Sequence, residues 1–311
     1  MFPFKKKHFL LFIFWFIADH TITAQSESLV SDTIKNTFSQ KRLGVLITTE
    51  AILYSGSLSA LNELWYKDFA HSSFHLFNDN NEWLQMDKMG HCVTSYSVGK
   101  VGIGLMKWSG VKRKKAIWYG GVLGSIFLNT VEILDGFSSG WGFSIGDLSA
   151  NTAGSLIVIA QELAWDEQRI VLKYSFQQSE YFKYNPNLLG KNLQQNLIKD
   201  YNGQTYWLSV NLYAFMNQQT KFPKWLNLAL GYGANGMVGA RTNPAIMDAS
   251  SNTIYFDRYR QFYLSLDIDL TRIKTKSNFL KTVFNTIGFI KFPAPALEFN
   301  KNGVKVLLLG F

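Results

Sequence analysis

Residues 132–151 read EILDGFSSGWGFSIGDLSAN, and this stretch decides the predicted fold. An apolar segment carrying Glu132 and Asp135 ends at a loop rich in glycine and serine, residues 136–142. A second apolar segment begins at Ser144-x-x-Asp147, a spacing that resembles a capping box at the start of a helix. The stretch therefore predicts two helices joined by a short loop, with acidic side chains near the junction.

The same residue composition extends to both sides of this stretch, from about Leu43 to Trp165. It is apolar and rich in Gly, Ala and Ser, which is typical of closely packed helices. Each predicted helix is about 20 residues long, enough to cross a hydrocarbon layer. The predicted helices cover residues 43–66, 87–108, 115–134 and 145–165.

A basic run, Lys112-Arg113-Lys114-Lys115, follows Gly110 and is expected in a loop. In a four-span protein with an exported N-terminus this run would lie outside, which violates the positive-inside tendency. The violation favours an outer-membrane protein, or a bundle that packs on a membrane or against a sheet. If one apolar segment does not cross the membrane, the basic run lies inside and the positive-inside tendency is obeyed.

From Arg169 onward apolar and polar residues alternate, as in residues 170–176, 206–212 and 262–270. Period two predicts strands, and Asn302-Gly303 predicts a hairpin between the last two. Six or seven strands are expected, fewer than the eight of the smallest usual closed barrel. The predicted fold class is α+β, an N-terminal four-helix apolar bundle followed by an antiparallel β-sheet or partial barrel. The terminal strand ends in Phe311 and is similar to the assembly signal of outer-membrane β-barrels.

Residues 1–24 are typical of an export signal, with Lys5 to Lys7 before an apolar run and Ala24 before a cleavage point. The apolar run is short for a membrane span, and a retained anchor is the alternative. The predicted organisation is a signal peptide over 1–24, a polar lead-in over 25–42, a helical domain over 43–167 and a β-rich region over 168–311.

Only 17% of the residues are charged, against a typical share of about 25%. Removal of residues 1–24 takes away three lysines and Asp19, so the formal net charge falls from +9 to +7. The remaining charge is dispersed, which disfavours nucleic acid and suits anionic head groups better.

Cys92 is the single cysteine, so no intrachain disulfide forms. It lies far from the cleavage point and is not expected to be the acylated residue of a lipoprotein.

Three polar blocks interrupt the apolar helices: Asp87-Lys88-x-x-His91, Glu132-x-x-Asp135 and Asp147-x-x-x-Asn151. A charge in a low-dielectric interior costs several kcal/mol unless it is paired, so we expect the blocks to meet in one polar site. Asp87 and His91 lie one helical turn apart. A carboxylate beside an imidazole suits a general base or a metal ligand.

The candidate catalytic residues are Asp87 and His91. The candidate polar-site or substrate-binding residues are Lys88, Glu132, Asp135, Asp147 and Asn151. A divalent cation is a candidate cofactor, because the oxygen ligands suit Mg²⁺ or Ca²⁺ and His91 would admit Zn²⁺ or Mn²⁺. Three interpretations stay open: a structural polar network, a ligand site and a catalytic site. His71 and His75 are expected to be solvated in a polar loop.

The three blocks, in this order and with a glycine-containing loop after the second, resemble the VanZ-like family of small helical membrane proteins. They are more similar to YfiM-type envelope proteins, lipoproteins of unknown function, and to their larger exported relatives. The similarity covers about residues 43–165. VanZ-like proteins tend to have Gln where this chain has Asp135, and they lack the strand-rich region. The resemblance implies an envelope protein linked to glycopeptide tolerance or lipid handling.

Two functions from different classes follow. The first is an exported envelope protein, at the outer membrane or its periplasmic face, with a buried polar site and with membrane lipid or envelope components as partners. The second is a membrane-embedded hydrolase or transferase, metal-dependent or acid-base, acting on lipid-linked or cell-wall substrates. In it His91 would be the base and Asp87 would orient it. The sequence does not decide whether the protein is an enzyme.

Overall fold

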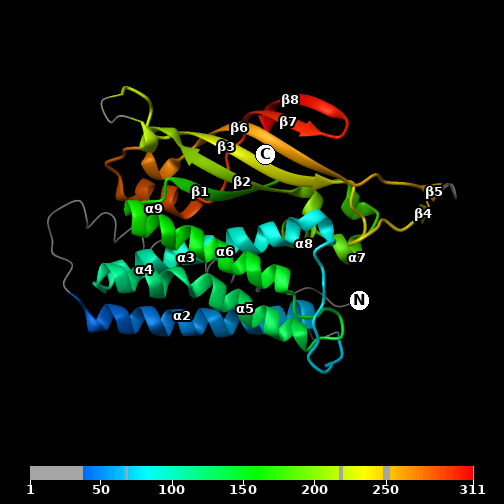
Figure 1. Ribbon diagram of the computed structural model, residues 1–311, viewed down its shortest axis with the longest axis horizontal. Helices are drawn as coiled ribbons and strands as arrows, with labels where there is room; N and C mark the ends of the chain where they lie inside the picture. The colour runs from blue at the N-terminus through cyan, green and yellow to red at the C-terminus, as the bar shows by residue number, and fades with distance from the viewer. Residues whose placement is uncertain (1–37, 67–68, 217–219, 248–252, 311) are drawn as a thin grey trace. The chain divides into compact units, whose positions relative to one another are not determined.

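The structure, a computed structural model, describes residues 38–66, 69–216, 220–247 and 253–310. It has the predicted mixed character, with helices up to Trp165 followed by an antiparallel sheet of six strands (Figure 1). The predicted export signal, the lead-in up to residue 37 and Phe311 lie outside the described residues.

The chain forms two compact units. The helical unit comprises the described residues of Met1–Asn78, Thr94–Gln168 and Lys274–Ile287. The sheet unit comprises those of Asp79–Val93, Arg169–Ile273 and Gly288–Phe311. Helix α3, Met86–Trp108, begins in the sheet unit and ends in the helical unit.

The long helices agree closely with the sequence pattern, except in the third. The other helices of this unit are α2 (Gln40–Leu61), α4 (Arg113–Gly121), α5 (Leu123–Gly136), α6 (Ile145–Trp165) and α9 (Asn278–Ile287). The predicted third helix is thus divided into α4 and α5 at Val122. The expectation that the basic run is a loop was wrong, because Lys112 caps α4 and the next three residues form its first turn.

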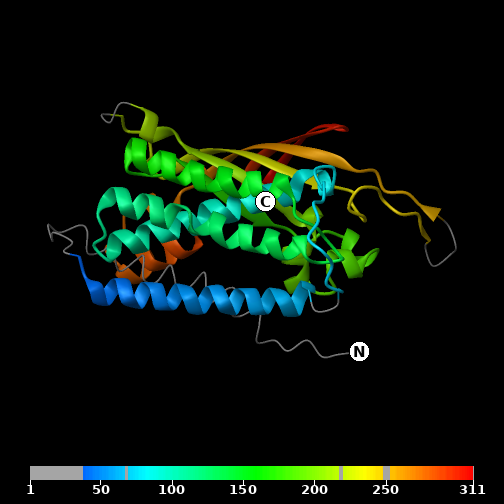
Figure 2. The ribbon, with the colours of Figure 1, turned by 60° about the horizontal axis from the view of Figure 1, so that its bottom comes forward.

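Small residues allow the helices of this unit to approach closely. A Cβ atom added at Gly120 would lie 2.4 Å from the carbonyl carbon of Gly102, so α4 lies backbone to backbone against α3. The hydroxyl of Tyr54 in α2 lies 2.5 Å from that of Thr130 in α5. Figures 1 and 2 both show α2 running beside α5.

The main sheet has the order β1-β2-β3-β6-β7-β8, and every neighbouring pair is antiparallel. Its strands are β1 (Ile170–Phe176), β2 (Gln204–Asn211), β3 (Leu226–Asn235), β6 (Tyr259–Ile268), β7 (Ala294–Asn300) and β8 (Gly303–Gly310). A separate pair comprises β4 (Ile246–Met247) and β5 (Thr253–Ile254). The predicted final hairpin is present, and Gly303 turns it with a φ of +116°.

The link between β1 and β2 contains two short helices that the pattern did not predict, α7 (Pro186–Leu189) and α8 (Leu193–Lys199). A 3-10 turn over Tyr201–Gly203 follows and leads directly into β2. This turn positions the Tyr201 side chain against the start of α3.

Candidate functional site

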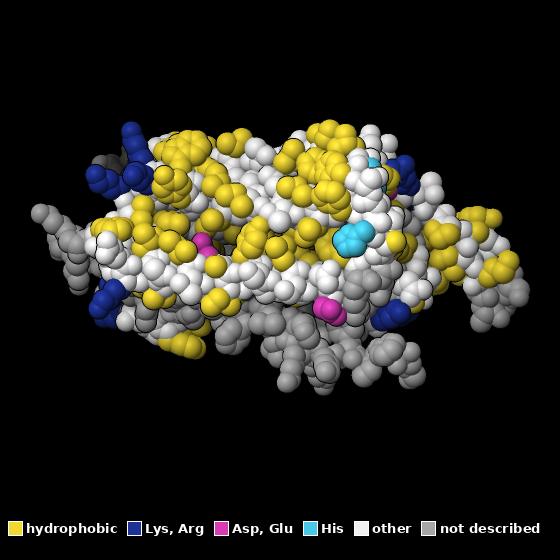
Figure 3. All heavy atoms as spheres, turned by 90° about the horizontal axis from the view of Figure 1, so that it is seen from below, with side chains coloured by type: hydrophobic (Ala, Val, Ile, Leu, Met, Phe, Trp, Pro, Cys, Tyr) yellow, Lys and Arg dark blue, Asp and Glu magenta, His cyan; other side chains and the backbone are white. Residues whose placement is uncertain are grey.

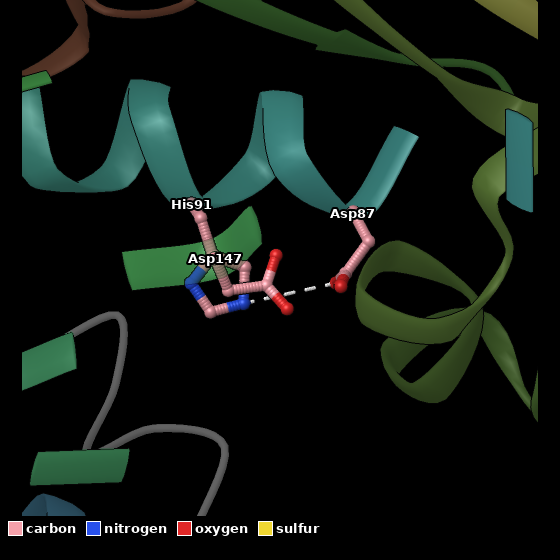
Figure 4. A group of neighbouring side chains, drawn as sticks. All are labelled: Asp87, His91 and Asp147. Carbon is pink, nitrogen blue, oxygen red and sulfur yellow. Dashed lines mark ion pairs between the residues drawn. The ribbon is translucent and has the colours of Figure 1, made fainter. Parts of the chain in front are cut away.

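The first two turns of α3 carry Asp87 and His91 on one face. His91 Nε2 lies 3.8 Å from Asp87 Oδ1, and both side chains are partly buried. Figure 4 shows this pair as a dashed line between two side chains that leave the same helix. The predicted spacing of four residues therefore places carboxylate and imidazole within reach of each other.

Asp87 is fixed by residues of the sheet unit. The Tyr201 hydroxyl donates a hydrogen bond of 2.6 Å to Asp87 Oδ1. Lys88 Nζ lies 3.5 Å from Asp87 Oδ2 and 2.5 Å from Asp79 Oδ2, so its charge is shared between two carboxylates. Asp87 is thus held by the Tyr201 hydroxyl on Oδ1 and by the Lys88 ammonium on Oδ2.

A left-handed turn precedes this pair. Trp83, Leu84 and Gln85 have φ values of +47°, +50° and +65°. Such angles cost about 1–3 kcal/mol at each non-glycine residue and persist where the surroundings impose them. The Trp83 N–H donates to the Ala240 carbonyl at 2.8 Å, and the Tyr232 hydroxyl donates to the carbonyl of Leu84. Backbone strain of this kind clusters at functional sites, so its position just before Asp87 and His91 supports a functional role for that pair.

The other acidic candidates lie in the helical unit, around the start of α6. Ser144 Oγ accepts from the Asp147 N–H at 3.1 Å, which confirms the predicted helix cap. Glu132 Oε2 in turn accepts from the Ser144 N–H at 3.2 Å. Glu132 and Asp147 are both buried, so the second and third blocks are linked through Ser144.

Asp135 and Asn151 have partners of their own. Asp135 accepts a hydrogen bond of 2.7 Å from the Tyr66 hydroxyl. Asn151, which is fully buried, donates to Asn129 Oδ1 at 2.9 Å. The contact of Asn151, from α6 to α5, is of the kind that a structural polar network contains.

Each unit thus assembles part of the predicted set. Asp87, Lys88 and His91 are neighbours in the sheet unit, and Glu132 is linked to Asp147 in the helical unit. That all three blocks form one site stays a prediction. His75, expected in water, instead has its Nε2 2.6 Å from the Trp141 carbonyl oxygen. Tyr201 and the turn before α3 were not anticipated.

One comparison with known proteins gives a match. Residues 75–161 are similar to the family described as "Predicted periplasmic lipoprotein (DUF2279)". No curated protein and no solved structure matches the chain. The matched segment contains all three polar blocks and under half of the 311 residues. It supports an exported protein of the cell envelope whose function is unknown.

Proposed function

We propose that the protein acts at the outer membrane, where its helical unit contacts lipid. The observation that carries this proposal is the surface of α2. Two helical stretches, Gln40–Leu61 and Arg113–Gly136, are long and apolar enough to cross a membrane by length and composition alone. Only 6% of the apolar window in Gln40–Leu61 is buried, and Ile52 is 66% exposed. A helix in water would turn such residues toward a core.

Charge supports the same proposal. The Ser39 N–H donates to the Ser109 carbonyl at 3.0 Å, so α2 begins beside the end of α3. Lys41 and Arg42 therefore lie at the same end of the unit as the basic run that opens α4. Trp118 and Tyr119 are exposed one turn farther along α4. Cations followed by aromatic residues and then by apolar surface are typical of a membrane interface.

Figure 3 shows the side of the molecule from which the helices of this unit are seen. Hydrophobic side chains are spread widely over this face, Lys and Arg side chains lie toward its ends, and isolated Asp or Glu side chains lie between them. Apolar surface with cations toward its ends is the distribution expected where a surface meets the interior and the head groups of a bilayer.

Vesicle flotation tests the proposal with purified mature chain and vesicles of phosphatidylethanolamine and phosphatidylglycerol. We expect the wild type to float and the double variant Val45→Glu, Ile52→Glu to bind roughly 100-fold more weakly, since each buried side chain contributes about 1.5 kcal/mol. Leu193→Glu is the matched control, an exposed aliphatic residue in α8 that should leave binding unchanged. A wild type that stays at the bottom of the gradient would refute lipid contact.

A second proposal concerns the polar blocks. We propose that Asp87 and His91 bind a divalent cation, each offering one ligand atom. The observation that favours it is the Asp87–His91 pair beside a strained turn. Carboxylates with one imidazole suit Zn²⁺ or Mn²⁺. A bound cation would activate water for hydrolysis.

Titration of the metal-free chain with Zn²⁺ and with Mn²⁺ by calorimetry tests this site. We expect His91→Ala and Asp87→Asn each to weaken binding at least tenfold. His75→Ala, a histidine outside the proposed site, should bind as the wild type does. If the wild type binds neither ion, or if the three variants are alike, the blocks form a structural network only.

A further inference from the structure

The main sheet buries its polar face. The register pairs Lys173 with Trp207 and Asn227 with Asp267, which puts alternate residues of neighbouring strands on one side. Lys173 is 1% exposed and Asp267 is 0% exposed. Other buried polar residues of this face are Ser175, Thr205, Ser209, Asn211, Asn227, Gln261, Ser265 and Glu298. The period-two pattern predicted a polar face but not that it would be the inner one.

Hydrogen bonds within this face satisfy most of the buried groups. Asp267 Oδ2 lies 2.7 Å from Lys173 Nζ and accepts from Ser209 Oγ at 2.6 Å. Asn227 Nδ2 donates to Ser209 Oγ at 2.9 Å, and Asn211 Nδ2 donates to Asn227 Oδ1 at 2.6 Å. Asp267 Oδ1 is buried without a hydrogen-bond partner among the described residues. The polar face is therefore an organised interior.

The chain before β7 closes this interior. The Tyr174 N–H donates to the Phe289 carbonyl, and the Lys291 N–H donates to the Tyr174 carbonyl, both at 2.9 Å. This segment continues into β7, so it joins the β1 edge to a strand at the other side of the sheet. Lys291 Nζ lies 4.5 Å from the centre of the Trp207 ring, and burial lowers the pKa of Lys291 to about 8.

The opposite face is apolar and partly exposed. In β1 and β2 its residues Leu172 and Tyr206 are buried, with Tyr206 beside Gly90 at the start of α3, whereas its exposed part lies farther along the sheet. Leu230 is 54% exposed, Phe262 is 53% exposed and Val306 is 75% exposed. In the two longest strands this face consists of Leu226, Leu228, Leu230, Tyr232 and Ala234 in β3 and of Arg260, Phe262, Leu264, Leu266 and Ile268 in β6. Its one charge, Arg260, lies at the start of β6. The centre of the face therefore carries no charge.

A sheet in water has its apolar face against a core and its polar face outward, because burial of polar groups is costly. This sheet has the reverse arrangement. We infer that its apolar face contacts the acyl chains of a bilayer with anionic head groups, so that the sheet unit forms a second lipid-contacting surface. The inference rests on the proposed function for the presence of a membrane, but it uses a different unit of the chain.

Strand length and charge at the rim favour lipid over a protein partner. β3 and β6 each have 10 residues, within the roughly 9–11 residues of a strand that crosses a bilayer. Lys221, Lys224 and Trp225 are exposed directly before β3, and Arg260 lies at the other end of the face. Cations and an aromatic side chain at the rim complement anionic head groups at the membrane interface.

Site-directed fluorescence tests the inference in the full chain with Cys92→Ser as background. Leu230→Cys and Val306→Cys, made separately, receive an environment-sensitive nitrobenzoxadiazole label. The chain is then mixed with phosphatidylglycerol vesicles that carry nitroxide on the acyl chains. We expect a blue shift and at least twofold quenching at both positions. Met247→Cys, in the exposed β4 outside the main sheet, is the matched control and should remain in water.

The outcomes separate this inference from the proposed function. If the chain floats with vesicles while labels at 230 and 306 remain in water, the sheet surface is refuted and the helical surface stands. If the labels are shielded without vesicles, or if they quench one another between chains, a second copy covers the face and the inference fails. If the chain does not float at all, both proposals fail.

Discussion

The carboxylate of Asp87 has different neighbours on its two oxygens. Oδ1 accepts from the Tyr201 hydroxyl and faces His91, whereas Oδ2 faces Lys88. Lys88 also lies 2.5 Å from Asp79 Oδ2, so its charge is shared between two carboxylates. A carboxylate held in this way can orient an imidazole, as both a metal ligand and a general base require.

At this scale the local part of the candidate site could be read from the sequence. The spacing of Asp87 and His91 needs only the pitch of a helix, and the Ser144 cap needs only three intervening residues. Tyr201 could not be predicted, because it lies 114 residues from Asp87 in the chain. Nor does any sequence signal mark Leu84 for a positive φ, which is imposed by tertiary contacts.

At the scale of elements, the glycines where α3 meets α4 support a stability prediction. Gly120→Ala would place a Cβ atom 2.4 Å from backbone atoms of α3, so the helices must separate. We expect a loss of roughly 1–3 kcal/mol in the free energy of unfolding. Gly56→Ala in α2 is the control, since no atom of the described residues lies within 4 Å of its Cβ position. It should gain about 0.5–1 kcal/mol from helix propensity. Thermal unfolding of both variants measures this, and equal effects would contradict the close approach.

Elements were predicted well where one period continues over many residues. The pattern gave α6 and β1 with their observed bounds, because each repeats one period without interruption. It missed α7 and α8, which have only 4 and 7 residues. The basic run was expected in a loop because it follows Gly110, but it opens α4, although cations at a helix N-terminus oppose the helix dipole. Arg113, the first residue of α4, forms an ion pair of 3.0 Å with the exposed Asp166.

For the whole molecule, the order of helices before strands followed from the change of period near Arg169. The division into units did not follow, because each unit combines segments far apart in the chain. The sequence pattern also gave no indication of which face of the sheet is buried. Alternation shows that Lys173 and Leu172 point to opposite sides, but only the closure by residues 289–291 makes the polar side the interior.

Cell fractionation tests both lipid-contacting surfaces in the envelope. Ile52→Glu alters the helical unit and Phe262→Glu alters the sheet unit, and both side chains are exposed. In water such changes alter stability by only about 0.5 kcal/mol, whereas a carboxylate facing lipid costs on the order of 2 kcal/mol. We therefore expect the wild type in the outer-membrane fraction after an alkaline wash, partial release of each single variant and nearly complete release of the double variant. Leu193→Glu should stay with the wild type. Recovery of the wild type from the cytoplasm or the soluble periplasm would contradict both surfaces.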